Sequence, residues 1–259
     1  MTRALAAPTF SRTWYACAAV ACLLLGWQVM ATVARSPLVP GLGEIWQETL
    51  RIIASGQLFK NMFATLGRVA SGFVLAFLTA FVLALGMGRR RGLAAFFEPL
   101  LIVGLTVPGL VWAILCIIWF GISLVGSAIA VAISIAPAIS LNLIQGVRSI
   151  NAELLEVAAM LRLPLSVRLR RLWLPGLLPV VFSGARLALS LAWKVIVLVE
   201  MFGLSSGVGF QLNSEFGAQN VAGVLAWTLC FAVVMAILEY GLLAPLEARL
   251  LRWRRASAV

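Results

Sequence analysis

The sequence predicts an all-α membrane protein that crosses the bilayer several times. Hydrophobic residues make up 63% of its 259 residues and charged residues only 11%, whereas a soluble domain carries about a quarter charged residues. Several apolar stretches approach the roughly 20 residues that a helix needs to span a bilayer. These stretches do not alternate between polar and apolar residues, as the strands of a membrane barrel do, so helices are the predicted elements.

Six apolar stretches are predicted to span the membrane, within a single transmembrane domain over residues 1–259. They are Trp14–Ala34, Val69–Met87, Pro99–Phe120, Leu124–Gln145, Gly176–Val199 and Val221–Pro245. We expect Pro108 and Gly109 to interrupt the third stretch and Pro137 the fourth, because proline removes a helical hydrogen bond. The alternative for the first stretch is a cleaved signal peptide, although its apolar run is longer than is usual for one.

The distribution of arginine predicts the orientation of the spans. One set of connecting segments carries most of the positive charge: Arg3, Arg12, Arg89, Arg90, Arg91, Arg148, Arg162, Arg168, Arg170, Arg171, Arg249, Arg252, Arg254 and Arg255. The positive-inside rule therefore places both termini and the long segment 147–173 in the cytoplasm. The net charge is +11, but the basic residues lie in short clusters between apolar runs and not on one polar domain. This distribution is typical of a membrane protein. We therefore expect membrane lipid as a partner and no nucleic acid.

The missing residue types exclude several classes of function. Histidine and aspartate are absent, so we expect no enzyme, no metal site and no cofactor in this chain. The only lysines are Lys60 and Lys194, and no Gly-Lys-Ser/Thr run occurs, so the chain has no P-loop to bind ATP. Energy for any driven process in which the chain takes part must therefore come from a partner or an ion gradient. The four cysteines lie in apolar stretches and are interpreted as small buried hydrophobic residues.

Two helices outside the spans are predicted. Residues 42–55 form an amphipathic helix on the outer face, with apolar residues at helical spacing from Ile45 to Ile53. The segment 147–173 is longer than a simple connection needs and contains a helix over residues 151–163. Asn151 suits its N-cap, and Pro164 is expected to end it. Its apolar face predicts a docking surface for another protein; the alternative is packing on the chain's own span ends.

This segment resembles the signature of the membrane subunits of ABC importers. In that signature Glu-Ala-Ala is followed by three residues, Gly, nine residues, Ile, one residue and Leu-Pro. The matching positions are Glu156, Ala158, Leu174 and Pro175, with Leu172 in place of Ile. Val157 and Arg162 depart from it, in place of Ala and Gly. Residues 38 to 253 also resemble the branch for nitrate, sulfonates and taurine, at Gly67–Phe73, Trp119–Gly121, Val199–Met201 and Ser205–Gly209.

The resemblance implies the fold of a type I ABC importer permease, in the cytoplasmic (inner) membrane of a bacterium. It implies that helix 151–163 is the coupling helix, with Glu153, Glu156, Val157, Ala158, Ala159, Leu161 and Arg162 as coupling residues. The implied partners are two ATP-binding subunits, a second permease copy or paralogue, and an extracytoplasmic solute-binding protein. Arginine at position 162 costs about 1 kcal/mol if the left-handed geometry that favours glycine is kept. Otherwise Pro164 sets a different turn, or docking is altered.

The fifth predicted span carries polar residues that we interpret as part of a translocation path. Arg186, Trp193 and Glu200 are seven residues apart and share one face within about 40°. Ser190 and Lys194 lie nearby, and Pro108 is a candidate gate in the third span. The basic groups would attract a small anionic solute. The alternative for Arg186 and Glu200 is snorkelling or pairing between helices.

The predicted function is that of a permease subunit for a small, anionic solute such as nitrate, a sulfonate or taurine. The segment Ser205–Gly209 is expected to be a flexible outer loop that contacts the binding protein or forms an outer gate. An ion-coupled secondary transporter or channel is the alternative function. That class is often built from inverted repeats, and none is evident in this sequence.

Overall fold

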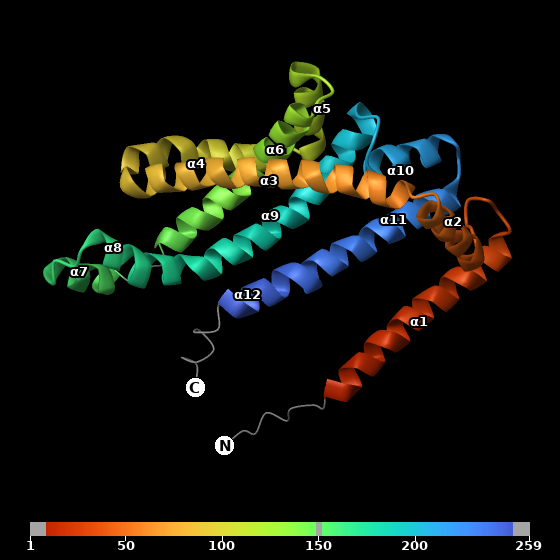
Figure 1. Ribbon diagram of the computed structural model, residues 1–259, viewed down its shortest axis with the longest axis horizontal. Coiled ribbons are helices and arrows are strands. Elements are labelled where there is room, and N and C mark those ends of the chain that lie inside the picture. Colours follow the sequence, from red (N-terminus) through yellow and green to blue (C-terminus); the bar gives the residue numbers. More distant parts are fainter. Residues whose placement is uncertain (1–8, 149–151, 251–259) are drawn as a thin grey trace. The chain divides into compact units, whose positions relative to one another are not determined.

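The computed structural model describes residues 9–148 and 152–250, and the regular elements within these ranges are all helices (Figure 1). In chain order they are α1 (Thr9–Ala34), α2 (Leu42–Ala54), α3 (Gln57–Arg89), α4 (Arg91–Thr106), α5 (Gly109–Phe120), α6 (Leu124–Arg148), α7 (Ala152–Met160), α8 (Leu165–Arg168), η1 (Leu169–Trp173), α9 (Leu174–Gly203), α10 (Val208–Gly217), α11 (Val221–Ala236), η2 (Ile237–Leu243) and α12 (Ala244–Leu250). The chain divides into two compact units. The first joins Met1–Leu58 with Leu212–Cys230, and the second joins Phe59–Gln211 with Phe231–Val259.

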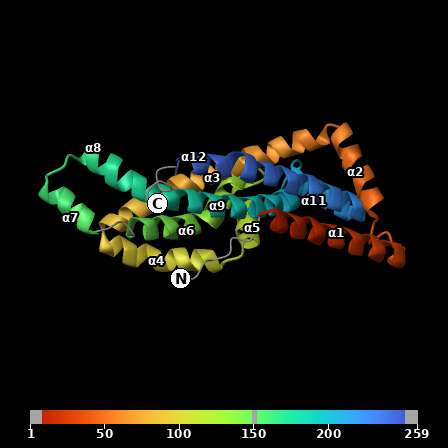
Figure 2. The ribbon, with the colours of Figure 1, turned by 90° about the horizontal axis from the view of Figure 1, so that it is seen from below.

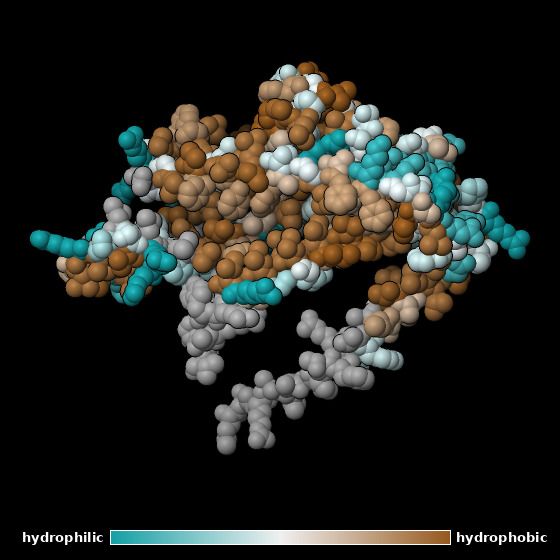
Figure 3. All heavy atoms as spheres, in the orientation of Figure 1, coloured by the Kyte–Doolittle hydropathy of each residue, from teal (hydrophilic) through white to brown (hydrophobic). Residues whose placement is uncertain are grey.

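The predicted all-α polytopic membrane fold is confirmed. Among the described residues, five helical segments are long and apolar enough to cross a membrane: Cys17–Ala34, Gln57–Gly88, Leu124–Arg148, Pro175–Gly203 and Val221–Leu250. A sixth span results if α4 and α5 together count as one broken span. Apolar side chains accordingly cover most of the visible helical surface (Figure 3).

The third predicted span is not one continuous helix. The helix is interrupted between α4 and α5, whose axes differ in direction by 99°. Val107 has the extended angles φ −73° and ψ 122°, which is the conformation that the ring of a following proline favours. Pro108 therefore stops α4 and begins α5. The prediction that Pro137 interrupts the fourth span is wrong, because α6 runs unbroken through this residue.

The second unit is held together by close packing around α6 and α9. Figure 2 shows α6 lying between α4 and α9, and the buried side chains of this unit form one apolar core that includes Ile135 and Ile196. Glycine permits the closest approaches. A Cβ atom at Gly146 of α6 would lie 2.6 Å from Val180 Cγ1 of α9, so no larger residue fits there without a shift of the helices.

In the first unit, α2 begins at the predicted residue and ends at Ala54, one residue short of the predicted 42–55. Its carboxylate Glu44 accepts a hydrogen bond from the backbone N–H of Gly41, which caps the helix. Arg51 of α2 lies 3.5 Å from Glu215 of α10, and this ion pair links the two helices.

The interpretation of all four cysteines as buried is only half right: Cys116 and Cys230 are buried, but Cys17 and Cys22 are exposed on α1.

Candidate functional site

The predicted coupling segment forms a short helix that presents apolar side chains to its surroundings. Asn151, the predicted N-cap, lies outside the described residues, and α7 begins at Ala152. The exposed fractions of the apolar side chains are high: Leu154 51%, Val157 50%, Met160 83% and Leu161 65%. Figure 3 shows this apolar patch in brown among polar side chains in teal. Of the other predicted coupling residues, Glu153 and Glu156 are exposed, Ala158 is buried, and Ala159 lies within the helix.

The end of α7 has the left-handed turn for which the family signature has glycine. Arg162 adopts φ +49°, and the N–H of Leu163 donates to the carbonyl of Ala158 at 3.0 Å. This bond, from the residue directly after the left-handed Arg162, is the outer bond of a Schellman motif. The carbonyl of Pro164 then accepts the N–H groups of Val167 and Arg168, so the proline opens the next helix rather than replacing the turn.

Because Arg162 occupies a conformation that glycine adopts without strain, the substitution Arg162→Gly is expected to stabilise the end of α7 by about 1 kcal/mol. Amide hydrogen exchange in α7 should slow about fivefold, since 1.4 kcal/mol corresponds to a factor of ten. As a matched control, Arg170→Gly within η1 should speed local exchange instead, because glycine weakens a helix interior. Unchanged or faster exchange in α7 of Arg162→Gly would contradict the assigned turn.

A buried polar cluster joins α3 to α9. Asn61, Thr65 and Arg68 recur at helical spacing and so lie on one face of α3. Glu200 of α9, whose side chain is 0% exposed, is the partner of Thr65 and Arg68. Arg68 Nη1 lies 2.6 Å from Glu200 Oε1, and the hydroxyl of Thr65 lies 2.9 Å from Oε2. A charge buried this deeply is tolerated only when it is paired and hydrogen-bonded, as Glu200 is here.

The same cluster fixes the segment Ser205–Gly209, so the prediction of a flexible loop is wrong. Arg68 donates to both the carbonyl oxygen and the hydroxyl of Ser206, at 2.8 and 2.7 Å. Three successive backbone N–H groups then donate to buried side chains of the cluster. These bonds run from Gly207 to Asn61 Oδ1, from Val208 to Thr65 Oγ1 and from Gly209 to Glu200 Oε2, each 2.9 Å long. The start of α10 is thereby held against α3 and α9.

Arg186, a second charged residue of the fifth span, is paired within the second unit. Arg186 Nε lies 2.6 Å from Glu239 of η2, and its Nη2 lies 2.9 Å from Glu247 of α12. Trp193 is buried and meets the ring of Phe231 edge to face, with 5.6 Å between ring centroids. Arg186 and Glu200 are thus both paired between helices, and their place in a translocation path stays a prediction.

A different face of α9 is exposed. Ser183, Ser190 and Lys194 recur at spacings of seven and four, within about 40° of one another, and all three are exposed. Lys194 has no hydrogen-bond or ion-pair partner among the described residues. The break before α5 lies close to Val195, the residue after Lys194 in α9, because a Cβ atom at Gly109 would lie 3.0 Å from Val195 Cγ2. Pro108 is exposed beside this contact.

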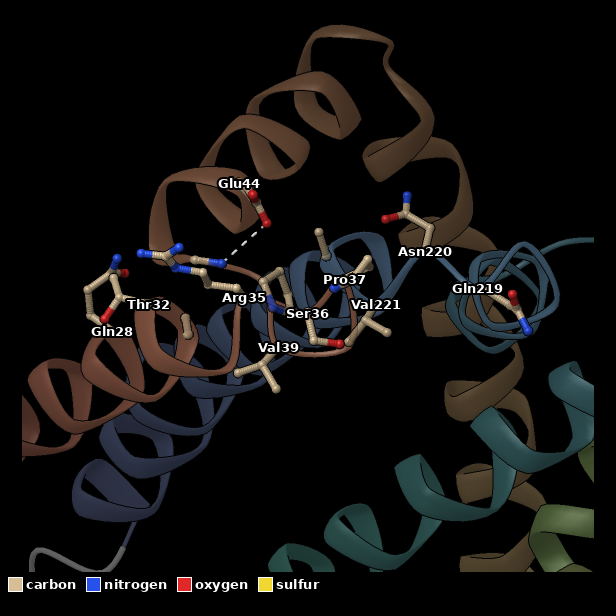
Figure 4. A pocket seen from close by; sticks show the side chains of 14 residues that line it. Gln28, Thr32, Arg35, Ser36, Pro37, Val39, Glu44, Gln219, Asn220 and Val221 are labelled. Atoms are coloured by element: carbon tan, nitrogen blue, oxygen red, sulfur yellow. Dashed lines mark hydrogen bonds between the residues drawn. The ribbon is translucent and has the colours of Figure 1, made fainter.

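The first unit contains a cavity of about 620 Å³ that sequence reasoning did not anticipate. Figure 4 shows the side chains of Gln28 and Arg35 on one side of this cavity and Asn220 on the other. Among the described residues that line it, Arg35 and Glu44 carry charge. Their opposite charges leave the cavity polar but close to neutral.

Sequence reasoning found Glu200 but not its partners on α3. The signal was present, because Asn61, Thr65 and Arg68 form a polar stripe at i, i+4 and i+7 in an otherwise apolar helix. Polar residues within a membrane span are expensive and are therefore candidates for pairing. The second predicted span began at Val69 and so excluded this stripe, whereas α3 begins twelve residues earlier, at Gln57.

Comparison with known proteins places the chain among transport proteins. Residues 72–250 match the family described as binding-protein-dependent transport system inner membrane component. A Bacillus subtilis protein provisionally named for aliphatic sulfonate transport is 30% identical over 232 residues, covering 89% of this chain and 84% of its own. The taurine transport system permease of Escherichia coli is 29% identical over 246 residues, covering 90% and 87%. The bicarbonate transport system permease of Synechococcus elongatus is 27% identical over 228 residues, covering 83% and 82%.

The match includes the segment Glu156–Pro175, on which the resemblance to ABC importers rests, and it extends through α9 to α12. A transport permease of this kind relies on an ATPase and a binding protein, and its own role is transport rather than catalysis. The fold, the broken span and the exposed helix α7 agree with that role. The chain belongs to the family of inner-membrane permease components of binding-protein-dependent ABC transport systems.

Proposed function

We propose that this chain forms one half of the translocation path of an ATP-driven importer for a small anion. A second permease copy or paralogue forms the other half, two ATP-binding subunits supply the energy, and an extracytoplasmic binding protein delivers the solute. The observation that carries the proposal is the family match over residues 72–250, which includes the exposed helix α7. Both termini and α7 lie in the cytoplasm in this proposal, because the arginine-rich segments are on that side.

The geometry of α7 supports its role as the coupling helix. A helix-in-groove contact needs exposed apolar anchors at helical spacing, and Leu154, Val157 and Leu161 provide them at i, i+3 and i+7. The left-handed turn at Arg162 and the proline that opens α8 fix the direction in which the chain leaves this helix. A movement of α7 is then transmitted through α8 and η1 to α9, since these elements follow one another without a gap from Leu165 onward.

Reversal of the charge at Glu156 tests this role. The substitution Glu156→Lys is expected to lower ATP-driven uptake by at least about tenfold, because an unfavourable charge at an interface costs several kcal/mol. ATP hydrolysis and membrane insertion should persist. Glu98→Lys is the control: Glu98 lies in α4, outside α7, and the charge reversal breaks only its exposed ion pair with Arg148, which contributes about 1 kcal/mol or less. Normal uptake by Glu156→Lys, measured in vesicles with the complete importer, would remove the coupling assignment.

We further propose that the exposed face of α9 lines the path. Ser190 and Lys194 lie on this face, and the break at Pro108 lies at the level of Val195. The unpaired ammonium of Lys194 would attract an anion, whereas Arg186, Trp193 and Glu200 would support the path from behind by holding neighbouring helices together. An anionic solute is also consistent with the sulfonate, taurine and bicarbonate that the names of three relatives specify.

A further inference from the structure

A second cavity, of about 470 Å³, lies beside Arg68 in the second unit. Its walls come from α3, the turn between α5 and α6, and the end of α9, with Phe63, Arg68, Ser123 and Ser205 among the lining residues. This volume lies within the range of small-molecule sites. The lining combines apolar surface with a few polar groups, and none of its described residues is acidic.

The guanidinium of Arg68 retains hydrogen-bonding capacity. Of the five N–H donors of an arginine, three are engaged, two at Nη1 with Glu200 and the Ser206 carbonyl and one at Nη2 with the Ser206 hydroxyl. The Nε donor and the second Nη2 donor have no acceptor among the described residues. Arg68 lines the cavity and its side chain is 13% exposed, whereas Glu200 does not line the cavity and its side chain is 0% exposed. A solute in the cavity would therefore contact the cation and not its counter-ion.

A second cation lies on the same helical face. Lys60 is exposed and precedes Ala64 by four residues and Gly67 by seven, and both of these line the cavity. Gly67 leaves open space where a side chain would otherwise lie, since no described atom outside its own stretch of α3 is within 4 Å of its ideal Cβ position. The wall of the cavity is therefore open at Gly67, and Lys60 adds positive charge to the same helical face.

We propose that this cavity is a binding subsite for the oxyanion group of the transported solute, such as a sulfonate or carboxylate. Two oxygen atoms of such a group fit the two remaining N–H donors of the planar guanidinium. Because Glu200 already neutralises Arg68, binding is weak, which suits a site that must also release its ligand. The proposal rests on the proposed function, from which it takes the class of solute.

The test compares two thiol reagents of similar size and opposite charge at single cysteines. The native residues Cys17, Cys22, Cys116 and Cys230 are first replaced by alanine or serine. Ser205→Cys then places a thiol in the cavity, and Leu38→Cys is the control, because Leu38 is 70% exposed in the first unit and does not line this cavity. The purified chain in lipid nanodiscs is treated with a sulfonatoethyl or a trimethylammoniumethyl methanethiosulfonate.

We expect the ratio of anionic to cationic labelling rates to be about tenfold higher at Ser205→Cys than at Leu38→Cys, because Arg68 lines the cavity whereas its counter-ion Glu200 does not, so that anions are favoured there. The double substitution Arg68→Gln/Glu200→Gln replaces both charges of the pair by neutral amides. In that background the labelling ratios at Ser205→Cys and at Leu38→Cys should lie within about twofold of each other. Equal ratios with Arg68 present, or no reaction at Ser205→Cys with either reagent, would overturn the proposal. The assay requires no ATP, so ATP-driven uptake, measured separately, still decides the proposed function.

Discussion

Removal of the charge at Arg68 is expected to destabilise the protein by about 3–5 kcal/mol, because Arg68→Gln leaves the buried carboxylate of Glu200 without its cation. The thermal unfolding midpoint in detergent should fall by roughly 6–20 °C for a chain of this size. The effect is large because the side chain of Glu200 is 0% exposed and water cannot replace the lost partner.

The double variant Arg68→Gln/Glu200→Gln provides the control. It removes both charges and retains amide groups of similar shape, so its midpoint should lie above that of Arg68→Gln alone. The two sites should show a coupling free energy of about 0.5–3 kcal/mol, as residues in one network do. If Arg68→Gln unfolds within 1 °C of the original protein, the buried ion pair does not stabilise the second unit in the way described here.

Gly207→Ala is expected to have a comparable effect for a steric reason. Gly207 has φ +108°, where a side chain strains the backbone, and a Cβ atom there would overlap the carboxylate of Glu200. That carboxylate cannot move aside easily, because Arg68, Thr65 and the N–H of Gly209 hold it. The strain and the overlap together should cost about 2–5 kcal/mol.

Gly217→Ala is the matched control for this substitution. Gly217 ends α10, and in the described part of the chain no atom outside this stretch of helix lies within 4 Å of the position that its Cβ would occupy. Its midpoint should stay within about 2 °C of the original or rise, because alanine is favoured over glycine in helices. Similar midpoints for Gly207→Ala and Gly217→Ala would show that the segment around Gly207 is not held against Glu200.

Local patterns in the sequence predict much of the fold. The composition and the apolar stretches predict the membrane class, and the spacing from Ile45 to Ile53 gives α2 to within one residue. The departure at Arg162 raised the question of a left-handed turn, and the structure shows that the turn is kept. Each of these features depends on residues that are close together in the chain, where helical periodicity and turn geometry are decisive.

The candidate site was harder to predict, because its contacts join distant parts of the chain. Glu200 stood out as a charge in an apolar span, but its cation lies 132 residues earlier, and helical spacing cannot relate the two. The Ser205–Gly209 segment contains small, flexible residues that indicate a mobile loop when taken alone. Its order comes from the hydrogen bonds that Asn61, Thr65 and Glu200 accept from it. The bend before α5 depends on Pro108, but its 99° angle depends on packing against α9.

The most direct test of the central claim is a cross-link from α7 to an ATP-binding subunit. Met160 is 83% exposed at the end of this helix, so Met160→Cys in the cysteine-free chain places a thiol on the proposed contact surface. With the complete importer in membranes, we predict a cross-linked product that contains this chain and a protein with a P-loop, in a yield that changes when ATP is added. Cross-links only within the chain itself, while ATP-driven uptake remains intact, would contradict the account.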